Sequence, residues 1–341
     1  MTAAVNVPAA ADVESTPIER VVQQARRSAG PCVDRRLSRV AALMFALLAM
    51  SPALAAAQQH IALPPVNLGI SSFMDAVSGP GLLLRENIGV YDAQRFRDAH
   101  GVTIAGQSSI FAFTSLSHIA YLFPEKVLCG YLGAEVLLPV VYVRLASPTG
   151  NLSTTGLGDV TFSPLVWQAP TLHLLGREVF QRLDMDIVAP TGDYSRNAPV
   201  TAGNNVWSVN PYYAVTWLAT QRIETSWRLS YLWNSTNHAP GPGYDATSIQ
   251  PGQAVHVNGA VSVVLLPGVR VGVAGYALRQ VTDSRANGRA VPGSLEQVAA
   301  LGPGLLASTK NTSLGVNSYW EFAAENRSEG VRMTAYLMRV W

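Results

Sequence analysis

Charged side chains alternate with apolar ones along several segments of the chain, so each segment has one polar and one apolar face. In residues 222–234, Trp227 and Tyr231 share one face while Glu224 and Arg228 share the other. Charged groups that face an enclosed interior can select solutes by charge and size, or they can brace that interior through salt bridges and hydrogen bonds. Both interpretations stay open, and they can hold together. The residues that we expect on the inward face are Glu135, Arg182, Asp184, Asp186, Glu224, Arg228, His256 and Glu321.

Nucleophilic catalysis needs a serine or cysteine beside a base, and the sequence offers only weak candidates. Ser115, Ser117 and His118 are neighbours, but side chains alternate along a strand, so His118 should point away from both serines. His256 with Asp184 is a second combination, and no Gly-x-Ser-x-Gly elbow occurs. The Cys and His residues show no metal-ligand spacing, and no helix follows the glycines near 156–158. We therefore expect no enzyme, no cofactor and no metal site.

The composition points to a protein with much apolar surface. Of the 341 residues, 48% are apolar and 13% are charged, against roughly 25% charged residues in soluble proteins. A net charge of +2 is too small to suggest a nucleic-acid partner. The remaining options are a large soluble β core, or a β-barrel whose outer face contacts lipid.

The alternating segments are long, and the connections between them differ in length. Strands that cross a membrane need about 9–11 residues, whereas strands of soluble proteins have about five or six. Tight turns at 124–125, 219–221, 267–268 and 309–312 mostly alternate with long polar loops at 97–107, 147–156, 191–204, 235–251 and 283–295. This order predicts an all-β, closed antiparallel transmembrane barrel with short periplasmic turns and long extracellular loops. The twelve predicted strands are 82–96, 108–122, 126–146, 157–168, 177–190, 205–218, 222–234, 252–265, 269–282, 296–308, 313–324 and 331–341.

Aromatic residues cluster near the predicted strand ends and at the end of the chain. Trp341 follows an alternating apolar segment, which is typical of the terminal signal read by the barrel-assembly machinery. The other aromatics fit girdles at the two membrane interfaces, although packing in a soluble β-sandwich core is the alternative. The girdle candidates are Trp207, Tyr212, Tyr213, Trp217, Trp227, Tyr231 and Trp233.

The N-terminal region reads as an export signal followed by an irregular segment. Arginines precede the apolar run 40–50, and the Ala-rich stretch 53–57 follows it, as in a secretory signal peptide. We expect residues 1–57 to be removed. Residues 58–80, rich in proline and glycine, form an extended lead-in that could enter and narrow the barrel, which comprises residues 81–341.

Several longer motifs carry a resemblance to a known family. The chain resembles the phenol-degradation meta-pathway family of outer-membrane transporter-like proteins. That resemblance implies a barrel in the outer membrane of a Gram-negative bacterium and uptake of hydrophobic or aromatic compounds, and it brings no established site residues. The motifs lie in residues 63–69, 73–81, 131–136, 156–160, 163–164, 190–193, 205–213, 224–228, 253–256 and 321–327.

The function that these observations favour is passive passage of small molecules, with outer-membrane lipid and the permeant as partners. A plugged structural or receptor barrel that acts through its extracellular loops is the first alternative. An outer-membrane lipolytic enzyme is the weaker one.

Overall fold

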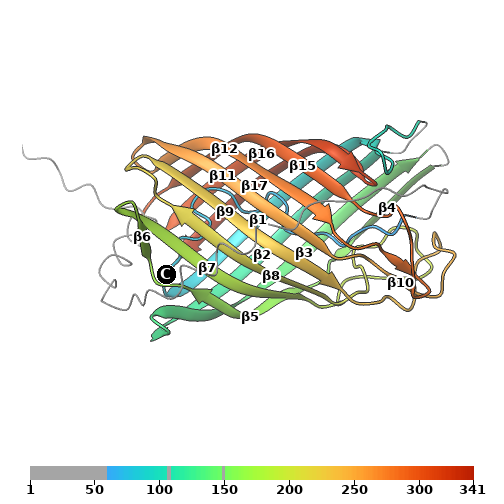
Figure 1. The fold of residues 1–341 in the computed structure, drawn as a ribbon, viewed down its shortest axis with the longest axis horizontal. Helices are drawn as coiled ribbons and strands as arrows, with labels where there is room; N and C mark the ends of the chain where they lie inside the picture. The colour runs from blue at the N-terminus through green and yellow to red at the C-terminus, as the bar shows by residue number, and fades with distance from the viewer. Residues whose placement is uncertain (1–59, 106–108, 148–149) are drawn as a thin grey trace, which may run out of the picture.

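A computed structural model describes residues 60–105, 109–147 and 150–341. These residues form a closed β-barrel (Figure 1). They include no helix that is long and apolar enough to cross a membrane. The expected signal peptide, residues 1–57, lies outside the described part of the chain.

The ring closes because the first strand pairs with the last. β1 (Gly81–Phe96) pairs with β17 (Ser328–Val340) on one side and with β2 (Ser109–Val127) on the other. Neighbouring strands are antiparallel. β4 pairs with one half of β3 and β5 pairs with the other half, so these two short strands together count as one strand of the wall. Counted in this way, the described residues form a ring of twelve strands. The predicted closed twelve-stranded barrel is therefore confirmed. The other strands of the ring are β3 (Gly130–Ser147), β4 (Gly150–Leu157), β5 (Thr161–Gln168), β7 (Arg177–Val188), β8 (Ser208–Trp217), β9 (Ile223–Asn234), β11 (Ala254–Leu266), β12 (Val269–Gln280), β15 (Gln297–Ser308) and β16 (Thr312–Glu325).

Side chains alternate across the barrel wall as the sequence pattern predicts. On β16, Leu314, Val316 and Trp320 are exposed on the outer face, whereas Asn317 and Tyr319 between them are buried. An apolar outer face suits contact with the hydrocarbon of a membrane. Closing the ring gives the backbone N–H and C=O groups of every strand a hydrogen-bond partner, which lipid cannot supply.

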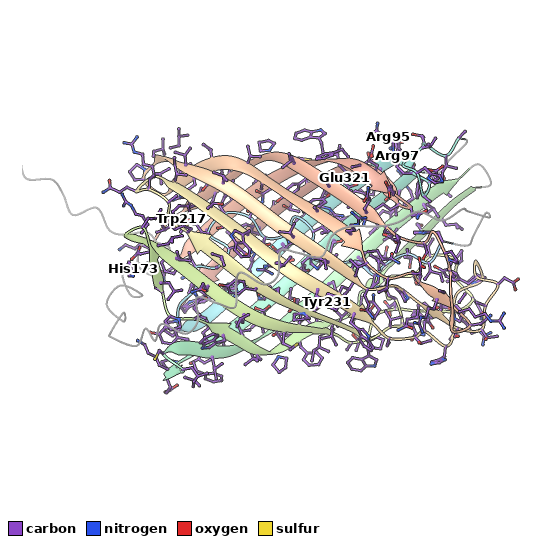
Figure 2. The ribbon with its side chains drawn as sticks, viewed as in Figure 1. Arg95, Arg97, His173, Trp217, Tyr231 and Glu321 are labelled. Atoms are coloured by element: carbon purple, nitrogen blue, oxygen red, sulfur yellow. The ribbon has the colours of Figure 1, made fainter. Side chains whose placement is uncertain are left out.

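The two ends of the barrel differ in their connections. The start of β1 and the end of the chain meet at the end with short turns, where the Trp341 N–H donates to the Leu82 carbonyl at 3.0 Å. Trp217 and His173 lie near this end, and Arg95 and Arg97 lie near the other (Figure 2). The long connections 189–207, 235–253 and 281–296 belong to that other end, which we assign to the cell exterior. Short strands decorate the connections: β6 (Leu172–Leu174) pairs with β7, and β10 (Ile249–Gln250), β13 (Arg285–Ala286) and β14 (Arg289–Ala290) form a small sheet.

Two predicted connections were wrong. Residues 150–156 of the predicted loop 147–156 belong to β4, which pairs with β3 from Ser147↔Gly150 to Val140↔Leu157. Most of β4 is exposed on both faces, so it has no apolar alternation for the sequence analysis to detect. The predicted turn at 124–125 lies inside β2, where a register shift between Leu122 and Lys126 accommodates the proline.

The lead-in segment, described from residue 60, runs through the interior of the ring (Figure 1). Its apolar residues Leu68 and Phe73 are 3% and 4% exposed. They belong to a buried cluster that includes Tyr276, Leu306 and Tyr319 of the wall. Apolar burial of this size holds an otherwise irregular segment in place.

Candidate functional site

An ion pair joins the lead-in segment to the barrel wall. The Asp75 carboxylate accepts hydrogen bonds from the Arg228 Nε and Nη2 atoms at 2.9 and 2.7 Å. The Arg182 guanidinium lies 3.6 Å from the same carboxylate, and the Arg228 guanidinium stacks 3.9 Å from the ring centroid of Tyr212. A two-point contact of this kind fixes orientation as well as distance.

Neutral hydrogen bonds fasten the rest of the lead-in segment. The Gly69 N–H donates to Asn258 Oδ1 at 2.7 Å, and the Tyr319 hydroxyl donates to the Gly69 carbonyl at 3.0 Å. Gly69 has a φ of +73°, and a Cβ atom there would lie 2.8 Å from the Tyr319 ring, so this position requires glycine. Further along, the Ala76 N–H donates to Thr216 Oγ1 at 3.0 Å. These contacts come from β8, β11 and β16, so the lead-in segment reaches distant parts of the ring.

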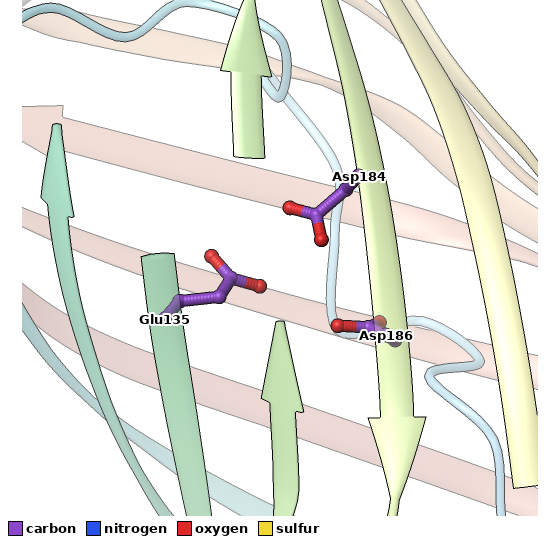
Figure 3. A group of neighbouring side chains, drawn as sticks. All are labelled: Glu135, Asp184 and Asp186. Atoms are coloured by element: carbon purple, nitrogen blue, oxygen red, sulfur yellow. The ribbon is translucent and has the colours of Figure 1, made fainter. Parts of the chain in front are cut away.

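Three carboxylates face one another beside this ion pair (Figure 3). One ligand oxygen from each of Glu135, Asp184 and Asp186 lies within 4.8 Å of the others. The Tyr212 hydroxyl donates to Asp184 Oδ2 at 2.8 Å, and the Ser163 hydroxyl donates to Asp184 Oδ1. We call Glu135, Asp184 and Asp186 the acidic cluster.

Irregularities in the sheet aim the acidic cluster inward. The β3–β5 register shifts between Gly133 and Glu135, and the β5–β7 register shifts between Phe162 and Val166. Register shifts bend a strand and redirect its side chains. The wall is therefore distorted on both sides of β5, where the three carboxylates meet.

A cavity of about 140 Å³ lies between the lead-in segment and the wall. Arg85 lines it, donating from Nη2 to the Ile70 carbonyl at 2.7 Å and stacking 3.8 Å from the ring centroid of Tyr336. Apolar groups and charged groups of both signs, with Asp75 and Glu135 as the acidic ones, therefore line one small cavity. Its other lining residues include Leu83, Leu122, Leu137, Leu306 and Met338.

The eight polar residues expected on the inward face fall into separate groups. Arg182 and Arg228 meet at Asp75, and Glu135, Asp184 and Asp186 form the acidic cluster. Their role in selecting solutes stays a prediction. Elsewhere in the lumen, Glu224 accepts hydrogen bonds from Ser226 and Ser262, Glu321 accepts them from Tyr91 and Tyr276, and His256 pairs with Asn210.

Sequence reasoning missed several residues of this site. Asp75 lies in the lead-in segment, where no strand pattern exists to place it. Arg85 lies in a strongly apolar stretch, and His118 was considered only as a catalytic candidate, although both line the cavity. The assignment of Tyr212 to an interface girdle was wrong: its side chain is 4% exposed and points inward. The alternation of β8, with Asn210 and Ala214 also buried, could have shown this.

The catalytic combinations considered from sequence are not assembled. Ser115 and Ser117 donate to the Glu86 carboxylate, each at 2.6 Å. His118 instead contacts Glu135 at 3.0 Å. Since side chains alternate, the serines and His118 lie on opposite faces of β2. His256 contacts Asn210 rather than Asp184.

Comparison with protein families adds an independent observation. The family described as "Putative MetA-pathway of phenol degradation" matches residues 93–337. The chain belongs to this family. No curated protein matches the chain in sequence.

Solved structures share the architecture of this family member. The COG4313 outer membrane channel from Pseudomonas putida F1 is 15% identical, with 85% of this chain and 100% of that chain covered and a TM-score of 0.67. The likeness shows the fold, a closed antiparallel barrel, and the apolar outer face of this chain suits contact with lipid. Two autotransporter domains share only the general barrel form. They are the translocator domain of NalP from Neisseria meningitidis (10% identity, 77% and 90% coverage, TM-score 0.44) and the β domain of Bordetella BrkA (12%, 77% and 100%, 0.45).

Proposed function

We propose that this family member lets small aromatic compounds cross the outer membrane passively, through the lumen beside the lead-in segment. The observation that carries the proposal is the cavity of about 140 Å³. A dry cavity of about 150 Å³ in another protein holds one benzene molecule, so this cavity fits a single aromatic ring. Its leucines suit the ring, and the Arg85, Arg182 and Arg228 guanidinium groups suit a hydroxyl or carboxylate substituent.

The P. putida structure, whose title names an outer membrane channel, and the family description, which names phenol degradation, both support this proposal. The described residues contain no phosphate-binding loop or helix that would serve a nucleotide, so passage follows the concentration gradient.

A pair of tryptophan variants tests the proposal. Leu137 lines the cavity and is 7% exposed, whereas the adjacent Leu138 faces outward and is 42% exposed. We expect Leu137→Trp to fill the cavity and to slow uptake of radiolabelled phenol or benzoate by cells at low concentration, to the rate of a deletion strain. Leu138→Trp, which places the same ring against lipid, should leave uptake unchanged. Equal uptake by wild-type and deletion strains would refute the proposal.

The lead-in segment favours one alternative, a structural or receptor barrel that stays plugged. Its hydrogen bonds with Asn258, Thr216 and Tyr319 hold the segment inside the lumen, where it fills part of the cross-section. This alternative predicts that no solute passes through the wild-type barrel, and that only the extracellular connections contact partners.

We also propose that the last strand is the contact to the barrel-assembly machinery. Met333 and Leu337 on the outer face of β17, and Trp341 directly after it, are each more than half exposed. Replacing Trp341 with alanine should slow insertion into the outer membrane, measured by the heat-dependent mobility of newly made protein on gels. An unchanged insertion rate would remove this assignment.

A further inference from the structure

The acidic cluster contains a carboxylate oxygen without a partner. Asp186 is 1% exposed, and its Oδ1 atom accepts no hydrogen bond from any described residue. Figure 3 shows this carboxylate directed toward those of Glu135 and Asp184. A buried acceptor that lacks a donor costs free energy, and such a group in a folded protein calls for a bound water or ion.

The spacing of the three carboxylates suits a metal ion of the calcium type. Their ligand oxygens lie within 4.8 Å of one another. Calcium binds carboxylate oxygens at about 2.3–2.6 Å, so two ligands on opposite sides of the ion lie up to about 5 Å apart. An all-oxygen donor set selects hard cations over zinc or copper.

Neighbouring side chains hold two of these carboxylates in position. Ser163 and Tyr212 donate to Asp184, and His118 lies 3.0 Å from the Oε2 atom of Glu135. Each carboxylate oxygen has a second lone pair that such hydrogen bonds leave available. Hydrogen bonds that orient metal ligands are a regular feature of metal sites.

We propose that Glu135, Asp184 and Asp186 form a calcium-binding site in the inner wall of the barrel. The nearest arginines do not replace the ion, because Arg228 makes its two-point contact with Asp75 and Arg182 faces the same carboxylate. Calcium tolerates variable geometry, whereas magnesium demands a tight octahedron with ligands at about 2.0–2.1 Å. Carboxylates from two strands separated by β5 suit the more tolerant ion.

A calcium ion here would tie β3 to β7 across β5. This is the part of the wall where register shifts interrupt both ladders. Glu135 also lines the cavity, so the ion would stiffen the wall of the proposed aromatic site without forming part of that function.

Terbium luminescence tests the site directly. Terbium replaces calcium in oxygen sites and emits when a nearby tyrosine is excited, and the Tyr212 hydroxyl is 2.8 Å from Asp184. We would refold the mature chain in detergent without lipopolysaccharide, strip it with EDTA and titrate terbium. We expect a saturable signal that calcium displaces, at lower concentrations than magnesium does. The thermal midpoint of the stripped protein should also rise when calcium is added.

Three variants assign the signal to the acidic cluster. We expect Asp186→Asn and Glu135→Gln each to weaken terbium binding at least tenfold. Glu224→Gln removes a buried inward carboxylate of a different group and should bind as the wild type does. If Asp186→Asn does not fold, Glu135→Gln carries the test, because its amide keeps an acceptor for His118. A wild type without a saturable signal, or a signal that survives both cluster variants, would overturn the proposal, whatever the uptake measurements show.

Discussion

Replacing Asp75 with asparagine should release the lead-in segment from the barrel wall. The Asp75 side chain is 6% exposed and that of Arg228 is 12% exposed, so the ion pair is largely shielded from water. Removing one partner of a buried ion pair costs about 3–5 kcal/mol, because the other charge stays behind without compensation. Here two guanidinium groups, of Arg228 and Arg182, would face each other across a neutral amide.

This free-energy cost determines how often the lead-in segment is released from the wall. At about 1.4 kcal/mol for each factor of ten, the released state should become about 100- to 4000-fold more populated. The Gly69 and Ala76 amide protons are hydrogen-bonded to the wall, and such protons exchange with solvent only when the segment opens.

Hydrogen–deuterium exchange measured by mass spectrometry reads this population. Peptides from the lead-in segment should exchange faster in Asp75→Asn by up to that factor, while peptides from β11 and β12 should not change. Asp92→Asn is the matched control, because Asp92 is an exposed aspartate on β1. If the lead-in segment of folded Asp75→Asn protein exchanges at the wild-type rate, the ion pair does not anchor the segment and the argument is refuted.

Three further predictions concern the lumen, the outer face and an extracellular loop. Deleting residues 61–80 should raise single-channel conductance in planar bilayers several-fold, and an unchanged conductance would show that the segment does not narrow the lumen. Ser117→Val removes a hydrogen bond to Glu86 on the outer face and should lower the free energy of unfolding in lipid vesicles by about 1–3 kcal/mol; a change below 0.5 kcal/mol, roughly the scatter of neutral surface substitutions, would contradict this. The Val102 N–H donates a hydrogen bond to the Asp98 carboxylate, and this bond lowers the pKa of Asp98. The bond therefore stabilises the loop fully at pH values above the ordinary aspartate pKa of about 4. This stabilisation is lost as the pH falls through the lowered pKa. The protection factor of the Val102 amide, which is its intrinsic exchange rate divided by the rate measured by NMR, should fall only in that acidic range, and a fall near pH 6 would count against this cause.

The ring could be predicted because its strands separate two different environments, which require apolar and polar residues to alternate along the sequence. A strand between lipid and a wet interior must alternate, and β9 and β16 do so almost without interruption. The alternation also placed Glu224 and Asp184 on the correct face. β4 escaped prediction because water surrounds it on both sides, so nothing constrains the polarity of its residues.

The site itself depends on contacts that no local pattern encodes. Asp75 meets Arg228 across 153 positions of sequence. Glu135 and Asp184 converge because of two register shifts, and such shifts depend on pairing between strands rather than on the residues of one strand. Sequence alone named lumen candidates on the strands, but it could not place Asp75 beside Arg228 or show which candidates lie together.

The route of the lead-in segment constrains the order in which the parts of the barrel can fold. Its anchoring partners include Arg85 near the start of the ring and Tyr319 near its end. The lead-in segment therefore cannot complete its contacts with the wall until the last strands of the ring are in place. Closing the ring and filling its lumen are therefore linked, because the segment and the last strands contribute side chains to the same buried cluster.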